Sequence, residues 1–325
     1  MRRTFILVAA AAAILGLTAC TPEVPQTSPA PSPSEAAAVV DSQAERILPA
    51  TFEELAAADE AADPALLTNR VGGNAKTIRG AQYKQHKADK DLVPDVIPNT
   101  AQAVYVSSAT TWPRTLVAVT EQPAEDITPI VMLWIQDGVG DDYQMRSWAH
   151  MIPGATLPAM AGPATGAEQL ALDDSNVTPT PAQVLEDYVK LLHDGTKSEL
   201  NDQFAPDSYR DQLFTARAVL TKAAKKAKGT YKDEITVDED QAYVMQTADG
   251  GALVFAPLTI TSTFTVKGAK VSVPAADKAL LKGKLTTKVV HTYLDPIIIY
   301  IPGPAIGSNP GVVAADHNLV KVAPK

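Results

Sequence analysis

One long stretch of alternating side chains limits the fold most strongly. Residues 252–266 read ALVFAPLTITSTFTV. Because successive side chains of a strand point to opposite faces, this order predicts an apolar face and a threonine face. The apolar face would hold Val254, Ala256, Leu258, Ile260, Phe264 and Val266, and the other face Thr259, Thr261, Thr263 and Thr265. A single strand of this length, bent at Pro257, indicates a strongly curved sheet.

Neighbouring segments supply further strands for this sheet. The turn residues Asp249-Gly250-Gly251 join the long strand to a short one at 242–245, which predicts a hairpin. Residues 285–294 and 297–301 are read as a strand that is broken at Pro296, and residues 318–322 as the closing strand. The glycine-rich residues 303–311 follow a strand without opening a helix, so we expect a loop there.

Two helices precede these strands. Thr180-Pro181-Ala182-Gln183 has the order of a helix start, with a capping threonine and proline at the first helical position. Apolar side chains then recur at helical spacing until Asp194-Gly195, and a second helix is predicted from near Ser208 to Gly229. Helices followed by antiparallel strands indicate an α+β fold, because a doubly wound fold would alternate helices and strands.

The first half repeats this order. Residues 35–48 and 51–62 are predicted to be helices, the second opened by a capping box from Thr51 to Glu54. Strands are predicted at 77–85, 101–108, 115–121, 130–135 and 143–151.

A short match between the halves suggests an internal duplication. When Tyr105-Val106 is placed over Tyr243-Val244, Leu116-Val117 falls on Val254-Phe255 without a gap. We therefore predict two tandem, cone-like α+β domains, 35–175 and 176–325. In each of them, N-terminal helices pack on a curved antiparallel sheet. The boundary lies near residues 172–178.

The N-terminus reads as a lipoprotein signal peptide, residues 1–19. Two arginines and an apolar run from Phe5 to Leu17 precede Leu17-Thr18-Ala19-Cys20, which resembles a bacterial lipobox. Cys20 is the sole cysteine and is predicted to carry a diacylglycerol anchor on the outer face of the cell membrane. The alternatives are an ordinary signal peptide and a free thiol, and the sequence leaves open whether export uses the general or the twin-arginine route.

Residues 20–34 form a tether rich in proline and serine. Such a segment extends by about 3 Å per residue, or on the order of 40 Å in total. The chain after residue 19 carries 26 basic and 37 acidic side chains, a net charge of about −11. This charge argues against nucleic acid as a partner and against electrostatic attraction to anionic lipids.

Neither half shows a catalytic or metal-binding motif. The histidines are scattered, no Gly-x-Ser-x-Gly elbow or phosphate-binding glycine loop is present, and Cys20 is the only thiol. The acidic run around Asp137 and Asp141-Asp142 lacks the later glutamate of a calcium-binding loop and is read as a hairpin turn. We therefore expect no enzyme activity, no cofactor and no metal ion.

The aromatic segment 143–151 is the candidate ligand-binding element. Strict alternation would place Tyr143, Met145, Ser147, Ala149 and Met151 on a core face that contacts the helices. Arg146, Trp148 and His150 would then share the opposite face with Gln144 and line a pocket. The alternative is that this face packs between the domains, and that alternative is favoured.

Several segments together resemble a known family. These are LLTNRVGGNAKTIRGAQY (residues 66–83), Trp112-Pro113-Arg114, YQMRSWAHMIPGATLPAM (residues 143–160) and DGGALVFAPLT (residues 249–259). They are similar to uncharacterised lipoproteins of high-GC Gram-positive bacteria, whose domain has no known function. The resemblance implies two domains similar to the nuclear-transport-factor-2-like or cystatin-like fold. It implies no activity and no catalytic residue.

These observations predict a non-catalytic lipoprotein of the bacterial envelope that acts as a binding or scaffolding module. Its expected partners are the membrane, through lipidated Cys20, and envelope proteins or a small hydrophobic ligand. A carrier of a hydrophobic ligand or lipid is the first alternative. A cell-wall hydrolase is the second, and it would need a pair of acidic residues in a cleft.

Overall fold

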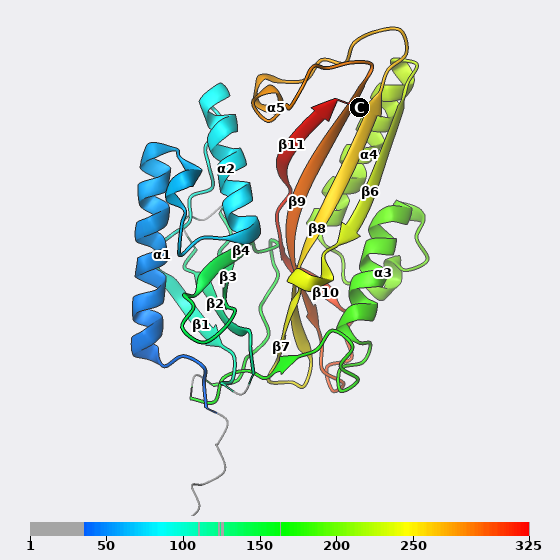
Figure 1. Ribbon diagram of the computed structural model, residues 1–325. Helices are drawn as coiled ribbons and strands as arrows, with labels where there is room; N and C mark the ends of the chain where they lie inside the picture. Colours follow the sequence, from blue (N-terminus) through cyan, green and yellow to red (C-terminus); the bar gives the residue numbers. More distant parts are fainter. Residues whose placement is uncertain (1–35, 110, 123, 125–126, 163, 325) are drawn as a thin grey trace, which may run out of the picture. The chain divides into compact units, whose positions relative to one another are not determined.

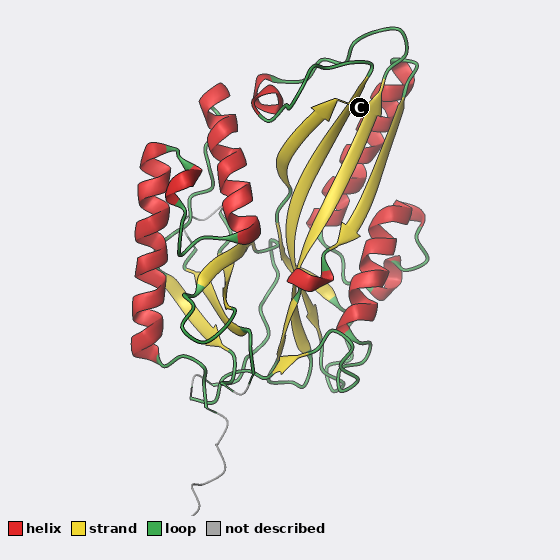
Figure 2. Ribbon diagram, in the orientation of Figure 1, coloured by secondary structure: helices red, strands yellow, loops and turns green. Residues whose placement is uncertain are grey.

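The computed structural model describes residues 36–109, 111–122, 124, 127–162 and 164–324, and the text below concerns the unit Glu35–Lys325. The predicted signal peptide 1–19 and tether 20–34, including Cys20, lie outside the described residues. The α+β class is confirmed: helices and antiparallel strands alternate in blocks along the chain (Figure 2).

The first half contains two long helices and a four-stranded antiparallel sheet. The helices are α1 (Asp41–Ala61) and α2 (Gly73–Ala88), with the short η1 (Pro64–Leu66) between them. The strands follow in chain order as β1 (Ala101–Val106), β2 (Arg114–Thr120), β3 (Ile130–Gln136) and β4 (Gln144–His150), and they pair in that order.

Two predictions for this half are wrong. Residues 35–48 and 51–62 do not form two helices, because α1 runs through Pro49, and Thr51 donates its hydroxyl to the carbonyl of Ile47 (3.0 Å) instead of capping a helix. Burial of one side of α1, including Leu48, outweighs the local cost of proline. Residues 77–85 are not a strand either. They belong to α2, whose residues Ala75, Ile78 and Arg79 are buried at helical spacing.

The second half has the predicted helices α3 (Pro181–Asp194) and α4 (Ser208–Lys226). A short helix, α5 (Ala275–Ala279), lies further along the chain, among the strands. Thr180 caps α3 as expected, since its hydroxyl accepts from the N–H of Gln183 (3.3 Å). Three short 3₁₀ helices connect the elements: η2 (Gly195–Lys197), η3 (Asn201–Gln203) and η4 (Glu239–Gln241).

A seven-stranded antiparallel sheet packs with these helices, and its first strand, β5, lies before residue 176. Its strands are β5 (Gln169–Leu170), β6 (Thr230–Val237), β7 (Tyr243–Gln246), β8 (Ala252–Thr265), β9 (Lys288–Ile301), β10 (Gly311–Ala315) and β11 (Asn318–Pro324). The long strand β8 is confirmed. Its partner β9 is continuous as well, so the predicted break at Pro296 is wrong.

Paired prolines mark the point where β8 and β9 change partners. Pro257 lies opposite Pro296 in the ladder. On one side of this pair the two strands are flanked by β7 and β10, and on the other side by β6 and β11. Proline has no N–H for a ladder bond, and it is tolerated here because each proline lies at the gap between two successive neighbour strands.

The two sheets pack face to face between two layers of helices (Figure 1). Residues of β2, β3 and β4 such as Val117 and Leu133 contact Leu253, Phe255 and Ile298 of the larger sheet. Helices α1 and α2 cover the outer face of the small sheet, and α3 and α4 that of the large one. The result is a four-layer helix–sheet–sheet–helix arrangement.

The residue pairs that suggested a duplication occupy matching places. Tyr105 pairs with Val117, and Tyr243 with Phe255; all four contact the core between the sheets. Their neighbours Val106 and Leu116, like Val244 and Val254, contact the helices of their own half. The duplication, the cone-like form of each half and the division near residue 175 stay predictions. Strand β5, which precedes that boundary, pairs with β7 of the second half.

Candidate functional site

The predicted ligand residues Arg146, Trp148 and His150 do not share one face of β4. Trp134 pairs with Met145 and Leu133 with Ser147, so Arg146 is the extra residue of a β-bulge. The bulge places Met145 and Trp148 together in the core under α1 and α2, while Ala149 contacts the core between the sheets. The predicted alternation along 143–151 is therefore wrong, and the assignment of these residues to a ligand stays a prediction.

Each of the three side chains has a partner within the protein. Trp148 is buried, and its indole N–H donates to Asp95 Oδ2 (3.1 Å). Arg146 pairs with Asp137 at 2.5 Å. His150 lies 3.0 Å from Asp316, which also accepts from the backbone N–H of His150.

The His150–Asp316 contact connects the small sheet to the large one. Asp316 lies between β10 and β11, and the neighbouring bridge between Met151 and Ala314 joins the same two regions. The hydrogen bond to Asp316 raises the pKa of His150, although partial burial alone would lower it. This pair therefore stabilises sheet-to-sheet packing most when His150 is protonated.

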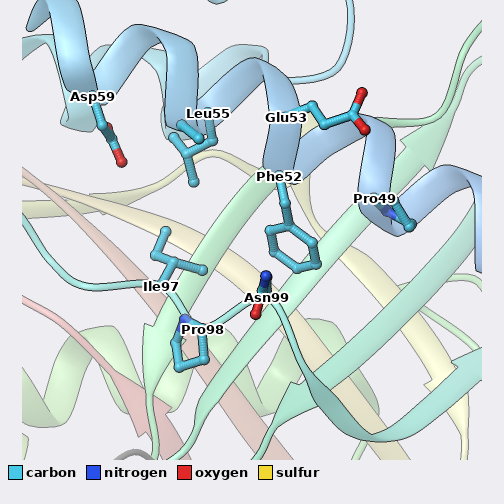
Figure 3. A pocket seen from close by; sticks show the side chains of 9 residues that line it. Pro49, Phe52, Glu53, Leu55, Asp59, Ile97, Pro98 and Asn99 are labelled. Carbon is cyan, nitrogen blue, oxygen red and sulfur yellow. The ribbon is translucent and has the colours of Figure 1, made fainter.

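An apolar groove follows one side of α1, and we call it the α1 groove. Its first part is a cavity of about 570 Å³ between α1 and the segment before β1 (Figure 3), lined by Pro49, Phe52, Glu53, Leu55, Ala56, Asp59, Ile97, Pro98 and Asn99. A second cavity of about 360 Å³ shares Pro49 and Asn99 with it and is lined further by Val39, Val40, Ala44, Glu45, Leu48, Val104 and Val106. Volumes and linings of this kind are typical of sites for apolar ligands.

Buried contacts fix the floor of the α1 groove. The ring of Phe52 points towards Asn99 and Pro98 in Figure 3 and meets Trp134 edge to face, with centroids 6.5 Å apart. Trp134 in turn donates its indole N–H to Thr51 Oγ1 (2.9 Å). The groove is therefore formed by side chains that the core already holds in place.

Three acidic residues line the α1 groove: Glu45 and Glu53 are exposed, and Asp59 is neutralised from behind. The carboxylate of Asp59 accepts from Arg79 (2.8 and 2.7 Å) and from Tyr83. Arg79 is 2% exposed and also donates to Gln82 and to the carbonyl of Asp95. Because this bidentate pair compensates the charge, Asp59 adds no free charge to the apolar groove.

A smaller, more polar pocket of about 220 Å³ lies between α2 and β11, and we call it the α2–β11 pocket. Its lining residues are Ile78, Gln82, Gln85, Leu92, Val93, Tyr293, His317, Asn318 and Leu319. Tyr293 and His317 stack with ring centroids 4.0 Å apart. Behind them, the fully buried Asp295 accepts from Tyr209 (2.7 Å) and from His317 Nδ1 (2.6 Å).

The hydrogen bonds of Asp295 hold the residues around the stacked rings of Tyr293 and His317 in place. A hydrogen bond from Nδ1 to the buried carboxylate of Asp295 fixes the orientation of the His317 ring. Asn318 donates its backbone N–H to Asp295 (3.2 Å), but its side-chain Nδ2 is buried without a hydrogen-bond partner. The sequence patterns do not predict this cluster. An aspartate inside the apolar run 294–299 was the available signal, because buried aspartates are nearly always paired.

Two general features can be stated for the part of the chain that the structure describes. No group of three or more histidine, cysteine, aspartate or glutamate side chains is placed to hold a metal ion. None of the described helices is both long enough and apolar enough to span a bilayer.

Comparison with known proteins gives a family without a known activity. A family model described as "Domain of unknown function (DUF8094)" matches residues 34–319. An uncharacterized lipoprotein of Streptomyces coelicolor is 25% identical over 255 residues, which cover 77% of this chain and 74% of that protein. No solved structure matches significantly. The resemblance to uncharacterised lipoproteins is thereby confirmed, whereas the likeness to nuclear-transport-factor-2-like or cystatin-like domains stays a prediction.

Proposed function

We propose that this chain, which belongs to the DUF8094 family, is a lipid-anchored protein of the bacterial envelope that binds an apolar ligand without transforming it. The lipobox at Cys20 and the name of the Streptomyces relative support the anchor. The comparisons indicate no enzymatic family, which supports a binding role. The two α+β halves, which we propose are duplicated cone-like domains, would form the frame that presents the ligand site.

The anchor is tested by changing the single cysteine. Cys20→Ala is expected to move the protein from the membrane fraction into the soluble fraction or the medium, because no acyl chain is then attached. Thr21→Ala, beside the cysteine, is the matched control and should remain in the membrane fraction. Unchanged membrane retention of the Cys20→Ala protein would exclude the anchor.

The observation that supports the ligand class best is the α1 groove. Its two adjoining cavities of about 570 and 360 Å³ are lined mainly by apolar side chains, and Val40 at its end is 56% exposed. An apolar groove of this size supports the proposal of a binding site. We propose an acyl chain as the occupant, since its elongated apolar form suits the paired cavities and the groove begins 19 residues after Cys20. A tether of about 40 Å between Cys20 and the folded unit keeps the groove within reach of the membrane surface.

A charge placed in the groove tests this proposal. Val40→Glu is expected to weaken binding of a fluorescent fatty acid at least tenfold, because burial of a carboxylate against an acyl chain is unfavourable. Val139→Glu is the matched control, since Val139 is 87% exposed in the turn between β3 and β4 and does not line the groove. Titration of the folded unit, followed by native mass spectrometry of the complex, measures both.

Two results would contradict the groove as an acyl-chain site. One is equal affinity of the Val40→Glu and Val139→Glu proteins for the fatty acid. The other is a wild-type protein that shows no saturable binding at all. Neither result would affect the anchor, which depends on Cys20 alone.

A further inference from the structure

Arg114 differs from the other arginines that are shielded from solvent. Five of them have an aspartate within 4.0 Å: Arg70 with Asp142, Arg79 with Asp59, Arg146 with Asp137, Arg210 with Asp207 and Arg217 with Asp233. Arg114 is half-buried, yet its side chain has no ion pair or hydrogen bond with any residue that the structure describes, and its Nε is buried. In a protein with an excess of acidic side chains, an unpaired guanidinium in such a place requires an explanation.

The guanidinium of Arg114 stacks on an aromatic ring. Arg114 Cζ lies 4.1 Å from the ring centroid of Trp112, as in a cation–π pair. A stacked guanidinium uses its flat face for the ring. The N–H groups on the two Nη atoms of Arg114, which are not buried as Nε is, stay available for an acceptor in the plane. Trp112 is 38% exposed, whereas Trp134 and Trp148 are 0% and 1% exposed. Trp112 is therefore the tryptophan that a ligand in solution can reach.

A second unpaired donor lies at the same end of the small sheet. Arg114 begins β2 opposite Gln136, the last residue of β3, and Tyr143 directly precedes β4. The hydroxyl of Tyr143 is buried without a hydrogen-bond partner. Burial raises the pKa of Tyr143 to about 12, so the hydroxyl keeps its proton.

The acidic side chains of the nearby turn do not serve Arg114. Asp137 and Asp142 pair with Arg146 and Arg70, and no carboxylate of Asp141 comes within ion-pair distance of Arg114. The positive charge of Arg114 is thus left for an external oxyanion, for which a guanidinium is the best-suited side chain.

We propose that Arg114 and Trp112 form a binding site for a sugar that carries a phosphate or carboxylate group. The guanidinium binds the oxyanion through its N–H groups in the plane, and the exposed ring of Trp112 packs against the apolar face of the sugar. This site is separate from the α1 groove, since neither residue lines the cavities described there.

Indole NMR signals provide a direct test, because the chain has three tryptophans. In the ¹⁵N-labelled folded unit, the signal of Trp112 is assigned with the Trp112→Phe variant. Glucose 6-phosphate and glucuronate are the probes, with glucose and inorganic phosphate for comparison. Binding of either charged sugar is expected to shift the Trp112 signal saturably and to leave those of Trp134 and Trp148 unchanged, since their N–H groups are held by Thr51 and Asp95.

Arginine variants separate specific recognition from net charge. Arg114→Gln is expected to raise the Kd for the charged sugars at least tenfold, and Arg114→Lys should also bind more weakly, because lysine lacks the planar fork. Arg46→Gln removes the same charge from an exposed position on α1 and should leave the Kd within twofold. Circular dichroism and the unchanged signals of Trp134 and Trp148 show that each variant is folded.

The proposal is overturned by any of three results. The first is no saturable shift of the Trp112 signal with either charged sugar. The second is an equal loss of affinity in Arg114→Gln and Arg46→Gln. The third is equal binding of uncharged glucose, which would exclude recognition of the anion, or of inorganic phosphate, which would exclude the contact with the ring.

Discussion

Replacement of Asn318 by leucine is expected to stabilise the protein. The side-chain Nδ2 of Asn318 is buried without a hydrogen-bond partner, while its backbone N–H is bonded to Asp295. Leucine has nearly the same shape as asparagine and no polar atoms in its side chain. It keeps the backbone bond, removes the unpaired donor and adds apolar surface to the lining of the α2–β11 pocket.

The size of the effect follows from the cost of the unpaired donor. A buried donor without a partner costs about 1–3 kcal/mol, and Asn318 lies at the lower end because part of its side chain reaches solvent. We therefore expect a gain of about 1–2 kcal/mol in the free energy of unfolding. With an unfolding entropy of roughly 2.1 cal/mol/K per residue over roughly 290 residues, this gain corresponds to a rise in Tm of about 2–3 °C.

Urea and thermal unfolding of the folded unit measure this difference, and Asn309→Leu is the matched control. The side-chain N–H of Asn309 donates to the carbonyl of Asp202 (2.7 Å), so the same substitution there removes a formed bond. We expect that control to be neutral or destabilising by about 0.5–1.5 kcal/mol. If Asn318→Leu destabilises the protein as much as Asn309→Leu does, the amide of Asn318 is satisfied in solution and the reasoning is refuted.

Two further predictions concern ion pairs. The pKa of His150 is raised by Asp316. The stability from this pair is therefore fully present below about pH 6.5 and is lost as the pH rises through the higher pKa of the folded state. Urea midpoints at pH 6 and pH 8 should differ less in His150→Gln than in the wild type or in the exposed control His193→Gln, and an unchanged difference would contradict the assignment. Arg79→Met removes the bidentate partner of Asp59 and leaves the neighbouring acceptors without their donor. Because the side chain of Asp59 is 36% exposed and can be hydrated, the expected cost is about 1–3 kcal/mol. Arg70→Met breaks a more exposed pair and should cost about 0–1 kcal/mol. Equal costs in urea unfolding would show that burial of Arg79 does not matter.

Local patterns predicted those elements whose causes are local. The start of α3 is set by Thr180 and Pro181, and the length of β8 by its alternation, so both were predicted correctly. Helix α2 was missed because its glycines argue against a helix. Gly80 is accepted within α2 because an added Cβ would lie 3.2 Å from Pro64, so the close approach of η1 calls for a residue without a side chain. The sequence alone does not show that α2 and η1 lie this close together.

The candidate sites were predictable to a smaller extent, because they depend on strand register and pairing. A single extra residue at Arg146 rotated the rest of β4, which separated residues that strict alternation had placed together. The bond between Asp295 and His317 exists because β9 and β11 are neighbours, and no motif connects the two positions. The α1 groove depends on the continuity of α1 through Pro49, which local propensity argues against.

The case of Arg114 shows why a functional arginine is hard to recognise in a sequence. In the sequence, Trp112-Pro113-Arg114 contributes only to a family resemblance, whereas the aromatic strand around Arg146 favours Arg146 as a ligand residue. The structure favours Arg114 as the ligand residue, because Arg146 is paired with Asp137 and Arg114 has no acidic partner. In a chain with 37 acidic residues, the whole set of tertiary contacts determines which half-buried arginine stays unpaired. A charge that is free to bind a ligand is therefore a property of the folded chain, and it can be inferred only after every other ion pair has been located.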